Sequence, residues 1–106
     1  MTTLEILRRG RERIAKGKCH DAYAVTLDNR KTTPNDPQAV AWCARGALGD
    51  LGNGGTFSTP EGNEAYLRLI EAAGVTSMTG LFEWNDKSSQ EVVVAGFDSA
   101  IKLAGG

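Results

Sequence analysis

The segment DPQAVAWCARGAL, residues 36–48, limits most narrowly how this chain can fold. Asp36 followed by Pro37 is typical of a helix start, because the carboxylate can cap a free amide and the proline ring presets φ. Placed around a helical axis at about 100° per residue, the apolar side chains of this segment cover more than half of the circumference. A surface helix carries a narrower apolar stripe. We therefore predict a central, buried helix at about 37–48.

Three further segments have the spacing of amphipathic helices, with their apolar residues on one face. They run from Thr3 to Lys16, from Thr59 to Gly74 and from Ser88 to Ala104, and one extra helical turn is predicted at 81–84. Residues 18–35 lose this period, and a weak alternation around Asp28 and Asn29 predicts a short β-hairpin at about 23–33. The predicted fold class is all-α (mainly α), a small four- to five-helix bundle around the central helix at about 37–48 with this hairpin attached.

Length and composition fit one compact unit. The 106 residues, with 41% hydrophobic and 24% charged side chains, are typical of a folded globular chain, and we predict a single helical domain over residues 1–106. The glycine-rich stretch at 49–58 is predicted to be a flexible connection. The longest apolar run, at 92–97, is far shorter than the roughly 20 residues that span a bilayer. We predict no membrane contact, a cytoplasmic location and two reduced cysteines.

Charge is distributed unevenly along the chain. Residues 1–18 hold six Lys or Arg and two Glu, which gives +4, whereas the rest holds six basic and eleven acidic residues, which gives −5. Arg8, Arg9, Arg13 and Lys16 form a basic face that is able to follow phosphates. Nucleic-acid-binding domains usually have a clear basic excess, however, and the net charge here is −1. We expect no nucleic-acid partner, and predict that the basic helix lies against an acidic body.

Two cysteines and one histidine are the candidates for nucleophilic catalysis. The alternative function is a small cysteine-dependent hydrolase or transferase that uses Cys19 or Cys43 with His20. Cys43 falls in the middle of the apolar face of its predicted helix, where burial raises the pKa of a thiol and makes it a poor nucleophile. The neighbours Cys19 and His20 point apart in most backbone conformations, and no orienting third group is evident. The spacing fits no zinc motif, so no metal and no cofactor are predicted.

Five residues are candidates for a binding surface instead. Trp42 lies on the polar side of its predicted helix, Arg11 interrupts an apolar stripe, and FEWND ends in Trp84, Asn85 and Asp86. A buried guanidinium needs a partner, for which Asp86 is the first candidate. Packing of Trp42 and local backbone bonds from Asn85 and Asp86 are the structural alternatives. We predict a non-catalytic module that binds an unknown protein or small ligand through Arg11, Trp42, Trp84, Asn85 and Asp86.

Two short motifs carry a resemblance to other proteins. With WCARGAL at 42–48, WND at 84–86, and EVVVAGFDSAIKLA after them, the chain resembles a family of small uncharacterised helical proteins of bacteria and their phages, grouped as a domain of unknown function. The resemblance covers nearly the whole chain. Lys18 departs from it, because an aromatic residue is more usual at this position. The resemblance implies a helical fold and brings no activity, cofactor or partner.

Overall fold

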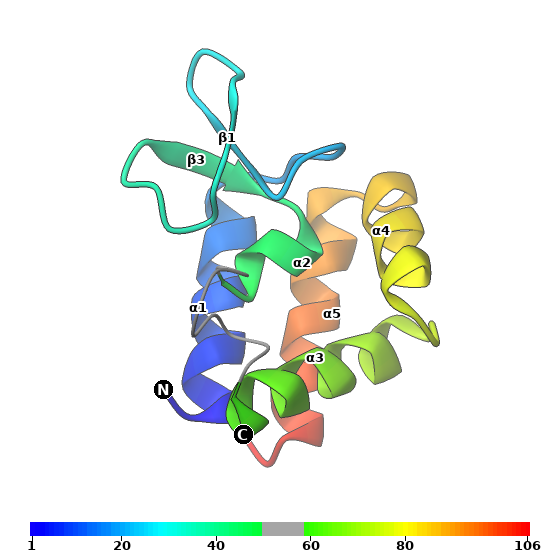
Figure 1. Ribbon diagram of the computed structural model, residues 1–106. Coiled ribbons are helices and arrows are strands. Elements are labelled where there is room, and N and C mark those ends of the chain that lie inside the picture. The colour runs from blue at the N-terminus through cyan, green and yellow to red at the C-terminus, as the bar shows by residue number, and fades with distance from the viewer. Residues whose placement is uncertain (50–58) are drawn as a thin grey trace.

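The computed structural model describes residues 1–49 and 59–106. These residues form five helices and three strands (Figure 1). The helices are α1 (Thr3–Lys16), α2 (Ala44–Ala47), α3 (Pro60–Ala73), α4 (Met78–Lys87) and α5 (Gln90–Leu103), and the strands are β1 (Ala24–Thr26), β2 (Lys31–Thr32) and β3 (Ala39–Trp42). The glycine-rich connection predicted at 49–58 lies outside the described residues except for Gly49. Within the described part of the chain, no helix is long and apolar enough to cross a membrane.

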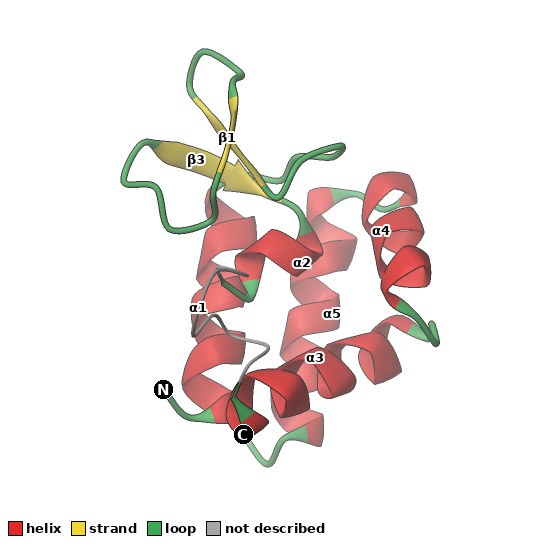
Figure 2. Ribbon diagram, in the orientation of Figure 1, coloured by secondary structure: helices red, strands yellow, loops and turns green. Residues whose placement is uncertain are grey.

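A small antiparallel sheet caps one end of the helices, so the predicted all-α class is wrong (Figure 2). Its strand order is β2-β1-β3, with Ala24 of β1 opposite Thr32 on one side and Trp42 on the other. The β-hairpin predicted at about 23–33 is confirmed, because β1 and β2 pair across a turn in which Asn29 has the left-handed φ of 65°. Asparagine tolerates this conformation better than most residues.

The central helix predicted at about 37–48 is also wrong, because residues 39–42 form β3 and only residues 44–47 are helical. Asp36 caps a turn and not a helix, since its Oδ1 accepts the amide of Gln38 at 2.9 Å. The strand then finds main-chain partners on both sides: the amide of Trp42 donates to the carbonyl of Gly17 at 3.0 Å, and the amide of Cys43 donates to that of Tyr23 at 3.2 Å. Tertiary pairing thus overrides a local helix signal.

The long helices pack around one apolar core. Most of their observed ends lie within a few residues of the predicted ones. Thr59 caps α3, and Gly74 ends it with a φ of 73°. The last helix begins one residue later than predicted, because the side chain of Ser89, and not of Ser88, accepts the amide of Val92. Buried apolar side chains from all five helices meet in the core: Ile6, Leu7, Ile14, Ala47, Leu48, Ala65, Leu69, Leu81, Val93, Phe97 and Ala100.

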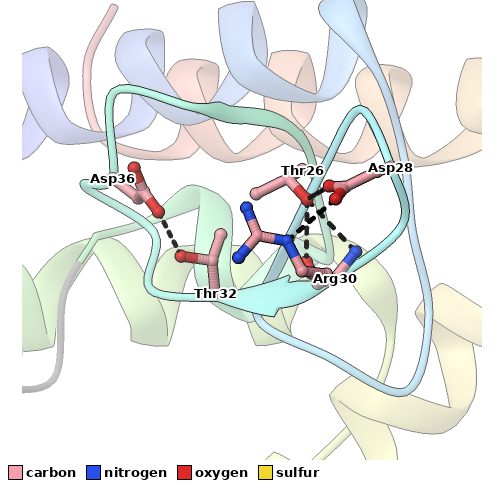
Figure 3. A network of polar contacts seen from close by, with 5 residues as sticks. All are labelled: Thr26, Asp28, Arg30, Thr32 and Asp36. Atoms are coloured by element: carbon pink, nitrogen blue, oxygen red, sulfur yellow. Dashed lines mark hydrogen bonds and ion pairs between the residues drawn. The ribbon is translucent and has the colours of Figure 1, made fainter.

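Side-chain hydroxyls and carboxylates fix the hairpin (Figure 3). The Thr26 hydroxyl donates to Asp28, whose second oxygen accepts Nε of Arg30 at 2.9 Å. The Thr32 hydroxyl donates to Asp36, which ties β2 to the turn that precedes β3. These hydroxyl hydrogen bonds are the main reason why the pKa values of both aspartates lie below the ordinary value. The polar network therefore holds the sheet without a large core of its own.

Helix α2 lies directly against the start of β1. A Cβ atom added at Gly46 would overlap the carbonyl group of Tyr23, which is main chain and unable to rotate away. We predict that Gly46→Ala lowers the free energy of unfolding by about 3 kcal/mol, the upper part of the range for overpacking.

Gly74→Ala is the matched control, because its added methyl group meets no atom within 4 Å. Its only cost is the strain of alanine at a positive φ. We expect this variant to lose about 1 kcal/mol. Urea unfolding of both variants measures the difference, and an equal loss would contradict the close approach at Gly46.

Candidate ligand-binding cleft

A cleft of about 530 Å³ lies between the hairpin and α4. In Figure 1 the blue segment between α1 and β1 extends toward α4 at this place. We call it the Tyr23–Phe82 cleft, and its lining residues are Asp21, Ala22, Tyr23, Lys31, Thr32, Cys43, Phe82 and Asp86. Its wall therefore combines segments that are about sixty residues apart in the sequence.

Two aromatic rings form the apolar wall of the cleft. The centroids of Tyr23 and Phe82 are 6.2 Å apart, with an interplanar angle of 41°. The guanidinium of Arg45 lies 5.5 Å from the centroid of the Tyr23 ring. Arg45 is only 4% exposed, and burial lowers its pKa to about 10. The Tyr23 ring is thus supported by a buried cation, while 40% of the residue stays open to solvent.

Charged side chains stand in the same wall. Asp21 and Asp86 contribute two carboxylates and Lys31 one ammonium group, so these three groups sum to −1. Asp21 adopts a φ of 62°, a left-handed conformation that aspartate tolerates better than most residues. The side chains that line the cleft are therefore partly apolar and carry one more negative than positive charge, while the cation of Arg45 lies behind the Tyr23 ring.

Asn85 connects α4 to the two chain segments that lie next to it at this cleft. Its side chain is 1% exposed, its Oδ1 accepts the amide of Ala44 at 2.9 Å, and its Nδ2 donates to the carbonyl of Cys19 at 3.0 Å. The FEWND segment lies inside α4, which is longer than the single helical turn predicted at 81–84. Because the segment is helical, Asn85 points inward while the next residue, Asp86, is exposed and reaches the cleft.

Neither cysteine is an activated nucleophile. Cys43 is 3% exposed, its Sγ accepts the amide of Gly46 at 3.3 Å and so caps α2, and burial raises its pKa. Cys19 donates its thiol to the carbonyl of Ala22 at 3.6 Å, and burial raises its pKa to about 11. His20 lines a neighbouring cleft together with Cys19, and it is absent from the wall that contains Cys43. These pKa directions are opposite to those of a catalytic thiol.

Metal binding has no basis in the described residues either, since no group of three or more His, Cys, Asp or Glu side chains there is placed to hold an ion.

The other predicted site residues lie apart from the cleft. Arg11 pairs with Asp98 of α5, with Nε 2.7 Å from Oδ1, and not with Asp86 as predicted. Both side chains are nearly half exposed, so the pair contributes little stability. Trp84 lies against α5, where a Cβ atom on Gly96 would be 2.6 Å from its ring. Trp42 is buried and lines a different cleft, beside α1. The structure thus does not bring Arg11, Trp42 and Trp84 together.

Six of the eight lining residues were not predicted from the sequence, among them Asp21, Tyr23 and Phe82. A signal for Phe82 exists, because it precedes Asp86 by four residues, and this spacing places both on one helix face. The prediction gave α4 only one turn, so this face was overlooked. Tyr23 and Asp21 come from a loop and a strand end, where no local pattern indicates a partner on α4.

Comparison with known proteins assigns the chain to a family. A protein-family model with the description "family of unknown function (DUF6197)" matches residues 1–103, so the chain belongs to this family. No curated protein and no solved structure matches the chain significantly. The description of the family names no activity, ligand or partner.

Replacing Asn85 tests its role as the connector. We predict that Asn85→Leu lowers the free energy of unfolding by about 3 kcal/mol, because the buried amide of Ala44 and the partly buried carbonyl of Cys19 both lose their partner. Glu83→Gln, at an exposed position of the same helix, should change it by less than about 0.5 kcal/mol. Urea unfolding measures both, and a small loss for Asn85→Leu would show that water or another group replaces the amide.

Thiol labelling tests the chemical state of the cysteines. With a pKa of about 11, Cys19 should react with a disulfide reagent about a hundredfold more slowly than free cysteine near neutral pH. Its rate should keep rising well above the ordinary pKa of a thiol, because the thiolate fraction continues to grow. His20→Ala should leave the rate unchanged. Fast labelling that depends on His20 would favour the enzyme alternative.

Proposed function

We propose that this member of the DUF6197 family is a non-catalytic module that binds a small molecule in the Tyr23–Phe82 cleft. The observation that carries the proposal is the meeting of an aromatic pair and two carboxylates in one wall. Ligand sites are concave, mostly apolar and equipped with a few polar groups that fix orientation. The volume of about 530 Å³ falls in the range of such sites.

The charges in the wall favour a cationic ligand with an apolar body. Asp21 and Asp86 attract an ammonium or amidinium group, and Lys31 offsets only one of the two carboxylates. The faces of Tyr23 and Phe82 carry the negative side of the ring quadrupole, which also attracts cations. A flat hydrocarbon part of the ligand gains contact with the same rings. We therefore propose an aromatic or aliphatic monoamine as the ligand class.

The cysteine-dependent hydrolase or transferase remains the alternative function. Its best support is that Cys43 lines the proposed cleft. Against it, the Cys43 thiol is occupied as a helix cap, and His20 belongs to the neighbouring wall. A binding role needs no such pair and accounts for both carboxylates.

Several features stay predictions from the sequence alone. They are the occurrence in bacteria and phages, the cytoplasmic location, the organisation as one domain and the lack of nucleic-acid, membrane and cofactor partners. Of the binding residues predicted from the sequence, the proposal keeps Asp86 as a ligand contact and Asn85 as its support.

A set of three matched compounds tests the ligand class. Phenethylamine, 2-phenylethanol and phenylacetate share one aromatic body and differ in charge. We expect amide NMR shifts at Tyr23, Thr32 and Phe82 to saturate at the lowest concentration with phenethylamine and at the highest with phenylacetate. Equal affinities would contradict charge selection, and no saturable shifts with any of the three would contradict the site.

Two substitutions distinguish a direct contact with the Asp86 carboxylate from a nonspecific effect of the net charge of the protein. Asp86→Asn should weaken phenethylamine binding about fivefold to tenfold, the loss expected for one partly exposed charge contact. Asp98→Asn removes the same charge from α5, where Asp98 pairs with Arg11 outside the cleft, and should have no effect. Equal effects of the two substitutions would indicate nonspecific attraction.

A further inference from the structure

A second cleft, of about 340 Å³, lies between α1 and the turn that precedes β3. In Figure 1 this turn is the teal loop beside the upper part of α1. We call it the α1 cleft, and its lining residues are Arg9, Glu12, Arg13, Lys16, Pro34, Asn35, Asp36, Pro37, Ala39 and Trp42. It shares no residue with the Tyr23–Phe82 cleft.

Three cations converge on the α1 cleft because of their spacing. Arg9, Arg13 and Lys16 follow one another at intervals of four and three residues, which places them on one face of α1. Arg8 is exposed and is absent from the wall. The helix thus directs part of its basic charge toward a concave surface and leaves the rest in solvent.

The described hydrogen-bond acceptors of Arg9 and Arg13 are neutral groups and not carboxylates. Arg9 donates from Nη2 to the carbonyl of Leu48 at 2.6 Å, and Arg13 donates from Nη2 to Oδ1 of Asn35 at 3.0 Å. Among the described residues, every ion pair belongs to another arginine: Arg11, Arg30 or Arg68. Nε of Arg9 and Nη1 of Arg13 are buried and have no hydrogen-bond partner in that part of the chain. Partly buried cations without a counter-ion are costly, and an anion lowers this cost.

The acidic residues Glu12 and Asp36 do not cancel the positive charge of the wall. The carboxylate of Asp36 already accepts the Thr32 hydroxyl (Figure 3) and the amide of Gln38 at 2.9 Å. Glu12 is exposed, and no described cation lies within ion-pair distance of it. Three cations and two anions give the wall a charge of +1.

Trp42 restricts the position of the Arg13 guanidinium. The Arg13 guanidinium lies 5.5 Å from the centroid of the indole ring, and the indole is itself fixed, since its Nε1 donates to the carbonyl of Pro34 at 2.9 Å. Burial, followed by the nearby charge of Arg9, lowers the pKa of Arg13 to about 10. A planar guanidinium held in this way loses less conformational entropy when it binds an oxyanion.

We infer that the α1 cleft binds the phosphate group of a small molecule between Arg9 and Arg13, with Lys16 at its edge. Arginine pairs recognise tetrahedral oxyanions through bidentate, charge-assisted hydrogen bonds. The small volume, about 340 Å³, and the acidic Glu12 in the wall suit a small phosphorylated compound better than the backbone of a nucleic acid. This site is independent of the function proposed for the Tyr23–Phe82 cleft.

Calorimetric titration with inorganic pyrophosphate, at constant ionic strength, tests the inference. We expect one site per chain and an affinity about tenfold weaker in Arg13→Gln, because one charge-assisted contact is lost. Arg8→Gln removes the same charge from the same helix outside the cleft and should change the affinity less than about twofold. In a Trp84→Phe background, Trp42 is the only tryptophan, and its fluorescence should change on binding.

Glu12→Gln separates a binding role from a folding role. Removing this exposed carboxylate should strengthen pyrophosphate binding about threefold, a gain that an unfolded or damaged variant is unable to produce. Three results would overturn the inference: no saturable binding to the original chain, equal losses in Arg8→Gln and Arg13→Gln, or tighter binding of duplex DNA than of pyrophosphate with dependence on Arg8.

Discussion

The buried amide of Asn85 is the interaction on which the arrangement of the proposed ligand cleft depends. Its two ends satisfy main-chain groups of Ala44 and Cys19, so a single side chain of α4 fixes both the start of α2 and the segment that follows α1. Breaking the hydrogen bond to Ala44 would leave a buried amide unpaired, and breaking the other would free a partly buried carbonyl. The neighbouring residue, Asp86, faces the cleft from the same helix. The geometry available to a ligand is therefore set by a residue that the ligand need not touch.

Helix ends were predictable where a local signal decided them. The first helix, and the start of α3 at Thr59 and Pro60, follow from caps and periodicity within a few residues. The pair Asp36 and Pro37 failed as a helix start because the same pair also closes a turn. The outcome depended on partners at Gly17 and Tyr23, which a local pattern does not contain. The predicted central helix was lost for this reason, and with it the all-α class.

The candidate site was predictable only in part, because its residues come together from distant segments. Asn85 and Asp86 stood out in the sequence as polar residues beside aromatic ones, although their separate roles depend on the length of α4. Arg11 needed a partner, as its position on an apolar stripe indicated, but the choice of Asp98 depends on how α5 packs against α1. Tyr23 and Phe82 contact each other across the hairpin and α4, and no spacing in one sequence encodes such a pair.

The small sheet also has a consequence for how copies of this chain behave in solution. On one side it ends in β2, which has two residues, one of them the exposed Lys31. On the other side, the segment at Lys18 forms a parallel bridge with Trp42 and covers the end of β3. Aggregation through strand edges needs a long row of free amides and carbonyls, and charge or shortness at an edge removes it. Among the described residues, the sheet thus contributes to the wall of the proposed cleft while its edges stay short, charged or covered.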